Sequence, residues 1–427
     1  MSSHDRERPG TAAPARRASS RGDGFHAMWK ELLPIGRAGS GGYRRFAWTG
    51  PDAECRAWFR AQAEARGLAY EVDANGNQWA WAGDKDAGDA VVTGSHLDSV
   101  PDGGAFDGPL GVISAFAAHD ELRARGVTFR RPFAVVNFAD EEGARFGVAC
   151  VGSRLLTGSL TREGAHALRD AEGISLPQAM EAAGHDPGAL GPEPERLARI
   201  GAFVELHIEQ GRTLAAASDS AAAGSHRIAV ASAIWPHGRW RFDFRGEANH
   251  AGTTRLEDRR DPMLTYANTV LAARKKARLA GALATFGKVT VEPNGVNAVP
   301  SRVSGWLDSR APDEETLASV VAQIETAAAE RGGRDGVAVE VTRESATPLV
   351  EFDHALRDRL VELLGGQVPV LPTGAGHDAG ILSASVPTAM LYVRNPTGVS
   401  HSPAEFAEED DCAAGVVALA DVLEGLV

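Results

Sequence analysis

Histidines and carboxylates cluster in four short segments of the chain. The segments are GSHLDSVPDGGAFDG from residue 94, ADEEG from residue 139, ELHIEQ from residue 205 and SHSP from residue 400. Imidazole and carboxylate groups together suit zinc or manganese. Two metal ions that share a carboxylate need several groups of both kinds, and these segments supply them. The combination indicates a metal-dependent site.

Each segment also has an ordinary explanation when it is taken alone. A single histidine is more often structural than a ligand, and the Asp-Gly pairs at Asp102 and Asp107 are typical of turns. A Glu-Glu pair commonly lies on a solvated face. If residues 205–209 form a strand, then Glu205, His207 and Glu209 share one side of it, which could be a wet strand face. Only the four segments together favour a metal site.

Two of the segments follow predicted strands. The apolar runs 90–93 and 133–138 have the length of buried strands. Between them, residues 111–125 carry an apolar stripe and are followed by Gly126, as is typical of a helix with a glycine cap. A strand, a helix and a strand in this order favour parallel neighbours, and ligand sites in such sheets lie beyond the carboxyl ends of the strands.

The pattern changes after about residue 225. Strands are predicted at 228–235, 240–244, 288–291 and 302–308, and helices at 262–280 and 314–331. The alternating α/β pattern returns near residue 347, with helices near 355–364 and 411–426. The simplest explanation is a small domain inserted into a larger one.

These elements predict an α/β fold. It has a central mixed, mostly parallel sheet flanked by helices, and an inserted smaller α+β domain. The predicted boundaries are a disordered tail at 1–24, the metal-binding domain at 25–225 and 347–427, and the inserted domain at 226–346.

The composition argues against several classes of protein. The chain has 427 residues, 43% of them hydrophobic, and a formal net charge of -13, which argues against binding to nucleic acid. No apolar run approaches the roughly 18 residues of a membrane span. Three widely spaced cysteines give no disulfide framework. Among them, Cys150 reads as a small buried residue. We expect a soluble cytoplasmic protein.

Eight strings make a resemblance specific. They are GSHLDSVPDGGAFDGPLGV, DEEGARFG, ELHIEQG, GEANHAGTT, GVNAVPSRV, LDSR, GAGHDA and GVSHSPAEF, in this order. They resemble the dinuclear-metal amidohydrolases of the peptidase-like family that includes aminoacylases and metal-dependent carboxypeptidases. Within that family they are most similar to the N-carbamoyl-L-amino-acid hydrolases and allantoate amidohydrolases. The resemblance runs from about residue 29 to the C-terminus.

The resemblance implies two divalent metal ions per subunit, Mn²⁺ or Zn²⁺, with Co²⁺ or Ni²⁺ as further candidates. Asp107 would bridge the two ions, and Glu141 would be the general base. Asp98 would orient the imidazole of His96, and the Asp107–Gly108 peptide bond would be cis as in relatives. The remaining metal ligands are His96 and His207 for one ion and Glu142 and His401 for the other.

The resemblance also implies that the inserted domain at 226–346 is a catalytic lid and dimerisation domain, and that its motifs contact the substrate. His250 resembles a residue that reaches into the partner subunit's site and stabilises the oxyanion, so the active unit would be a homodimer formed through the lid. Asn297 and Arg310 resemble a clamp for the substrate carboxylate, and Gln210 resembles a contact to the ureido group. Arg255-Leu256 departs from the Pro-Met that relatives commonly carry after HAGTT.

The expected reaction is cleavage of a ureido C–N bond of a small carboxylate. Allantoate is the first candidate, with ureidoglycine or ureidoglycolate, ammonia and CO2 as products. N-carbamoyl-L-amino acids or N-carbamoyl-β-alanine are the alternative, and aminopeptidase or aminoacylase activity comes third. Two other classes remain open. A dinucleotide-binding oxidoreductase would need a GxGxxG motif, which GAGH from residue 374 does not complete. A catalytically inactive metal-binding module would have lost a ligand or the base, and none is lost here.

Overall fold

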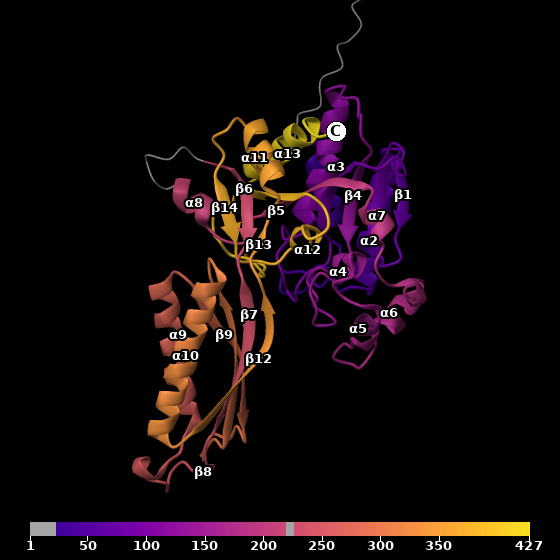
Figure 1. The fold of residues 1–427 in the computed structure, drawn as a ribbon. Coiled ribbons are helices and arrows are strands. Elements are labelled where there is room, and N and C mark those ends of the chain that lie inside the picture. The colour runs from indigo at the N-terminus through magenta and orange to yellow at the C-terminus, as the bar shows by residue number, and fades with distance from the viewer. Residues whose placement is uncertain (1–22, 219–225) are drawn as a thin grey trace, which may run out of the picture.

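Two β-sheets with separate cores organise the residues that the computed structural model describes, 23–218 and 226–427 (Figure 1). The larger sheet has nine strands in the order β1-β2-β4-β3-β5-β15-β6-β13, with β14 beside β6. Its strands are β1 (Ala69–Val72), β2 (Gln78–Ala82), β3 (Ala90–His96), β4 (Phe133–Phe138), β5 (Ile200–Ile208), β6 (Ile228–Ile234), β13 (Val350–Glu351), β14 (Val370–Thr373) and β15 (Thr388–Val393).

The centre of this sheet is parallel. Strand β3 pairs in parallel with β4 and β5, and β5 pairs in parallel with β15. Strands β1, β2 and β13 add antiparallel pairs toward the edges. The prediction of a mixed, mostly parallel sheet is therefore confirmed. Because the central strands are buried on both faces, they are almost continuously apolar, as β4 (FAVVNF) illustrates.

Helices cover both faces of the large sheet. Helix α3 (Pro109–Ala124) is buried over most of its length, and its Phe116 is fully buried. Burial of one such ring contributes about 1.5–3 kcal/mol. The other helices of this domain are α1 (Asp23–Leu32), α2 (Gly50–Ala65), α4 (Val151–Thr157), α5 (Arg162–Ala167), α6 (Leu176–Ala182), α7 (Pro194–Leu197), α8 (Thr213–Ser218), α11 (His354–Leu363), α12 (Asp378–Leu382) and α13 (Glu409–Glu424).

The small domain is an antiparallel sheet in the order β12-β7-β11-β9, covered on one face by two helices (Figure 1). Phe242, Phe244 and Ile324 are fully buried in its core. Its elements are β7 (His237–Arg245), β8 (Asn249–His250), α9 (Pro262–Ala280), β9 (Leu283–Glu292), β10 (Ala298–Val299), β11 (Arg302–Arg310), α10 (Glu314–Asp335) and β12 (Ala338–Thr347). Short 3₁₀ turns occur at Pro187–Ala189 and Leu256–Asp258.

Three details that were predicted from the sequence differ in the structure. The predicted lid started at residue 226, but β6 belongs to the large sheet because it pairs with β15 and β14, so the small domain starts near His237. The Asp107–Gly108 peptide is trans; Gly108 instead takes a φ of +83°, and the cis bond among the described residues joins Glu292 and Pro293. Most of the predicted tail lies outside the described residues, and α1 begins at Asp23.

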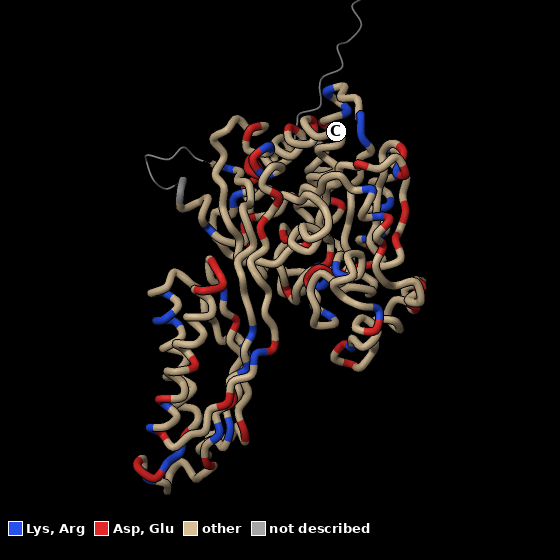
Figure 2. The backbone as a smooth tube through the Cα atoms, in the orientation of Figure 1, with Lys and Arg blue, Asp and Glu red and all other residues tan. Residues whose placement is uncertain are grey.

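Charge is distributed without a dominant patch. Figure 2 shows acidic and basic residues interspersed along both domains of the described chain, with no continuous basic stripe. No helix within residues 23–218 and 226–427 combines the length and the apolar character that a bilayer span requires.

A substitution at Gly94 tests how tightly the central strands β3 and β4 pack. Its φ is +150°, and a Cβ there would lie 1.9 Å from the carbonyl oxygen of Val136 in β4. We predict that Gly94→Ala lowers the free energy of unfolding by about 1–3 kcal/mol or more, because a strand must move. Gly333→Ala is the control, since a Cβ at Gly333 meets nothing within 4 Å. Thermal unfolding measures both, and equal midpoints would contradict this packing.

Candidate active site

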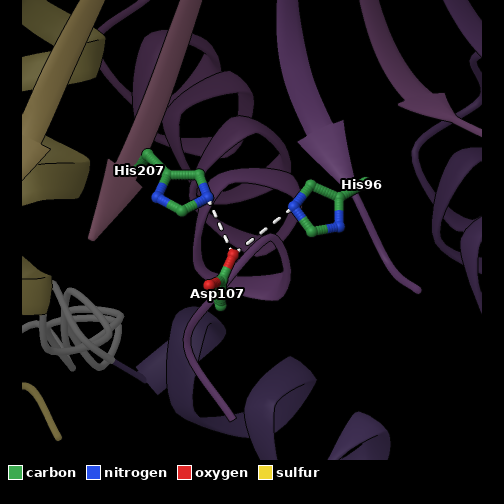
Figure 3. Close-up of side chains that lie close together, drawn as sticks. All are labelled: His96, Asp107 and His207. Atoms are coloured by element: carbon green, nitrogen blue, oxygen red, sulfur yellow. Dashed lines mark ion pairs between the residues drawn. The ribbon is translucent and has the colours of Figure 1, made fainter. Parts of the chain in front are cut away.

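Four segments that are distant in sequence meet at one edge of the large sheet. Strand β3 ends at His96, residues 139–142 follow β4, and His207 is the next-to-last residue of β5. These strands are neighbours and run in parallel, so their carboxyl ends lie together. Asp107 comes from the loop before α3, and Figure 3 shows the imidazoles of His96 and His207 pointing at its carboxylate.

The first group of ligands is His96, Asp107 and His207, all buried. Asp107 Oδ1 lies 3.6 Å from His96 Nε2 and 3.2 Å from His207 Nε2. Neither Nε2 atom has a hydrogen-bond partner among the described residues, although both atoms are inaccessible to solvent. Two buried imidazole nitrogens aimed at one carboxylate oxygen are the arrangement that a divalent cation would satisfy.

The second group is Asp107, Glu142 and His401. His401 Nε2 lies 3.3 Å from Asp107 Oδ2 and 3.8 Å from Glu142 Oε2. Burial, together with the charge of Asp107, raises the pKa of Glu142 to about 7. Both groups use Asp107, one through each oxygen, so the residues fit two metal ions that share this carboxylate.

Neighbouring groups hold the imidazoles in orientation. His207 Nδ1 is 2.9 Å from the carbonyl oxygen of Ile208, which leaves Nε2 for a metal. His96 Nδ1 lies 3.2 Å from the main-chain oxygen of Asp98 and 3.5 Å from its carboxylate. The main-chain contact is therefore the closer one. The Asp98 carboxylate also accepts the backbone N–H groups of Glu141 and Glu142, at 3.1 and 3.0 Å.

Glu141 lies beside the first group. It is buried, and its Oε2 is 3.8 Å from His96 Nε2. Burial, opposed in part by His96, raises its pKa well above the ordinary value. A raised pKa suits a carboxylate that must take up and release a proton near neutral pH.

Two of the predicted substrate contacts lie near the metal ligands. Gln210 Nε2 donates to Asp107 Oδ2 at 2.8 Å. Gln210, His401 and Arg310 all line one cavity of about 710 Å³. The guanidinium of Arg310 donates to Asp308 through Nε at 2.8 Å and to the carbonyl oxygen of Gly374 through Nη1. It thus extends from the small domain to the large one.

The other two predicted contacts lie elsewhere. His250 is in β8, at the end of the small domain farthest from the large sheet (Figure 1). Asn297 is beside it, because its carbonyl oxygen accepts the N–H of Ala251 and Ala298 pairs with His250. Both His250 and Asn297 are exposed. Within one chain, Asn297 therefore does not join Arg310 in a clamp.

Sequence reasoning missed a residue that supports Asp107. Glu405 is buried, and its Oε2 accepts the backbone N–H groups of Phe106 and Asp107 at 2.9 and 3.0 Å. Its Oε1 accepts the hydroxyl of Ser400 at 3.1 Å. The string GVSHSPAEF contained both residues, but only its histidine received a role.

A second buried carboxylate, that of Glu205, links the elements that carry the site. Glu205 accepts the hydroxyl of Ser95 at 2.7 Å and the N–H of Ala379 at 3.0 Å. It thereby ties β5 to β3 and to α12. His377, just before α12, packs against His207 with ring centroids 4.5 Å apart and the ring planes tilted by 59°. Burial lowers the pKa of His377 well below the ordinary value. The expectation that Glu205 lies on a wet strand face is wrong.

Comparison with known proteins identifies the family. Residues 92–425 match the model of peptidase family M20/M25/M40. The chain belongs to this family. It is 37% identical over 402 residues to the N-carbamoyl-L-amino acid amidohydrolase of Geobacillus stearothermophilus, covering 92% of this chain and 96% of that one. It is 33% identical over 411 residues to the allantoate amidohydrolase of Escherichia coli K12, covering 93% and 97%.

A solved structure agrees with this assignment. An amidase of the hydantoinase/carbamoylase family from Burkholderia multivorans superposes with a TM-score of 0.83 at 30% identity, covering 95% of this chain and 97% of that one. The resemblance that the eight strings indicated is thus confirmed at the level of the M20 family and its amidohydrolase relatives.

The shared carboxylate gives a direct test of the metal centre. We predict that Asp107→Ala lowers the content of both ions, whereas His401→Ala lowers mainly one, because Asp107 belongs to both ligand groups. Elemental analysis of protein dialysed against Mn²⁺ or Zn²⁺ measures ions per chain. Asp102→Asn is the matched control, since Asp102 lies in the same loop but pairs with Arg44. Equal loss in Asp107→Ala and His401→Ala would argue against a bridging carboxylate.

Proposed function

We propose that this protein hydrolyses the ureido C–N bond of a small carboxylate with the help of two divalent metal ions. The observation that carries the proposal is that one cavity is lined by groups suited to both ends of such a substrate. His401 and Gln210 line it at the metal ligands, and Arg310 lines it from the small domain. Arginine suits a carboxylate because its planar fork can donate two parallel hydrogen bonds.

The chemistry follows from the residues at the metal end. When bound by His96, His207, Glu142, His401 and Asp107, the ions supply Lewis acidity and lower the pKa of water toward 7. Glu141 takes the proton from the attacking water and delivers it to the leaving nitrogen. The donors suit Mn²⁺ or Zn²⁺, and Co²⁺ or Ni²⁺ remain candidates.

The carboxylate end of the substrate would contact Arg310, some of whose N–H groups already have partners in the protein. Asp308 accepts from Nε and Nη2 of Arg310, at 2.8 and 3.2 Å, and so fixes the plane of the guanidinium. The N–H groups not engaged by Asp308 and Gly374 remain for the substrate carboxylate. Gln210 would contact the ureido group, since it already lies against the metal ligand Asp107.

The cavity wall bears on which ureido carboxylate is turned over. Trp235, Leu283, Leu371 and Pro372 are among the residues that line it. An apolar wall favours an N-carbamoyl-L-amino acid with an apolar side chain, whereas allantoate places a second ureido group there and needs polar partners. Allantoate, the first candidate from the sequence, stays as the competing substrate.

His250 acts in trans under this proposal, from a second copy of the chain. His250 and Arg310 lie at opposite ends of the small domain, because Arg310 pairs with His237 at the start of β7 and His250, in β8, follows the end of β7. The 9 residues of β7 span about 30 Å. A small substrate that contacts Arg310 therefore cannot reach His250 of the same small domain, however that domain moves relative to the large one. We therefore propose a homodimer through the small domain.

We also place the protein in the cytoplasm. All three cysteines are free and buried, and unpaired thiols are typical of a reducing compartment.

A substrate panel tests the activity. We predict that the Mn²⁺-loaded enzyme releases ammonia from N-carbamoyl-L-amino acids with apolar side chains faster than from N-carbamoyl-β-alanine or allantoate. Glu141→Gln is the control for the mechanism: it should keep its metal content and lose at least about a hundredfold in kcat, since a general base contributes about 10²–10⁴-fold. If allantoate is turned over faster than the other compounds, allantoate is the substrate. If the wild type releases no ammonia from any compound of the panel, the proposed function is contradicted.

Complementation tests the role of His250. We predict that Glu141→Gln and His250→Ala are each nearly inactive and that activity returns when the two are mixed and allowed to exchange subunits. In the mixed dimer, one site combines an intact Glu141 with the other chain's intact His250. A mixture that stays as inactive as its components would place His250 in its own chain's site, or outside the reaction.

A further inference from the structure

The carboxylate of Glu141 receives one side-chain hydrogen bond among the residues that the structure describes. The donor is the thiol of Cys150, whose Sγ lies 3.4 Å from Glu141 Oε1. The other oxygen, Oε2, faces His96 Nε2 at 3.8 Å. Cys150 and Glu141 are 3% and 6% exposed, so bulk water does not replace the thiol as a donor. Each carboxylate oxygen therefore has a different neighbour.

The backbone brings the thiol to this position. Cys150 has φ 58° and ψ 40°, a left-handed conformation, directly before α4. Its N–H donates to the carbonyl oxygen of Glu141 at 2.6 Å. The next two N–H groups, of Val151 and Gly152, donate to the carbonyl oxygens of Asp140 and Ala139 at 3.0 and 2.9 Å. The first turn of α4 thus holds the main chain of the base, and the thiol holds its side chain.

We propose that Cys150 is a positioning residue for catalysis: its thiol fixes Oε1 of Glu141, so that Oε2 is the oxygen presented to the attacking water. The inference rests on the proposed role of Glu141 as the base. A thiol is protonated and a donor at neutral pH. It is a weak donor, but in a buried site it is the one that keeps the carboxylate from rotating away from the metal ligands.

The inference predicts a loss of turnover without a loss of binding. Cys150→Ala removes the donor and leaves Oε1 buried without a partner, so we expect kcat to fall about tenfold, in line with the loss of a hydrogen bond to a charged group. KM and metal content stay at the wild-type values, because no metal or substrate ligand changes. Cys150→Ser keeps a donor on a shorter bond and should recover most of the rate.

Matched variants separate this role from packing. Cys412→Ala removes another buried thiol, in α13, and should leave kcat unchanged. Cys150→Gly also lacks the donor but favours the left-handed backbone, so it serves if Cys150→Ala does not fold. In the Glu141→Asp background the shorter carboxylate is withdrawn from the thiol, and Cys150→Ala should then have little further effect, as expected for two groups that act through one contact.

The measurements are kcat, KM and metal content with the ureido substrate that the wild type turns over fastest. An unchanged kcat in a folded donor-free variant overturns the inference and leaves the proposed function intact. Equal losses in Cys150→Ser and Cys150→Ala, or a loss of metal in parallel with kcat, also overturn it, because they indicate a structural role. A wild type that hydrolyses no ureido carboxylate removes the proposed function, and this role of the thiol with it.

Discussion

The carboxylate of Asp107 is the group around which the site is built. Its Oδ1 faces His96 and His207, and its Oδ2 faces His401 and Gln210. Burial alone would disfavour its charged form, but the three imidazoles more than offset this and hold the pKa of Asp107 well below the ordinary value. A carboxylate that stays ionised while buried is what two neighbouring cations need, so the ligand groups depend on this one anion.

Asp107 reaches that position because its loop is held from two directions. Glu405 accepts the N–H of Asp107 from one side. On the other side Gly108 packs against the ring of His96, where a Cβ would lie 2.4 Å from Cε1. The proposed base is held in a similar way, between the carboxylate of Asp98 and the first turn of α4. Backbone groups thus carry most of the positioning, which leaves the side-chain atoms of the ligands for metal.

Local patterns predicted the elements well and their partners less well. Helix α9 has the predicted bounds because Pro262 starts it and Gly281 caps it in a left-handed conformation. The assignment of β6 to the small domain was wrong, because nothing within its own residues distinguishes a strand of the small sheet from a strand beside β15. The metal ligands came from motifs at strand ends. Glu405 lies 298 residues from the N–H that it accepts, and the bond of Cys150 depends on a left-handed turn, so neither has a local signal.

The proposed active site has two parts, one in each domain, and this separation makes activity depend on formation of the dimer. Every proposed metal ligand and Glu141 come from the large domain of one chain, whereas His250 and Asn297 lie together at the far end of the small domain. The link between the domains consists of two short connections, between β6 and β7 and between β12 and β13. Rotation about them moves the far end most and Arg310 least. Under our proposal a single chain completes its metal centre, but only a second chain completes the oxyanion contact, so metal binding and turnover respond differently to dissociation of the proposed dimer.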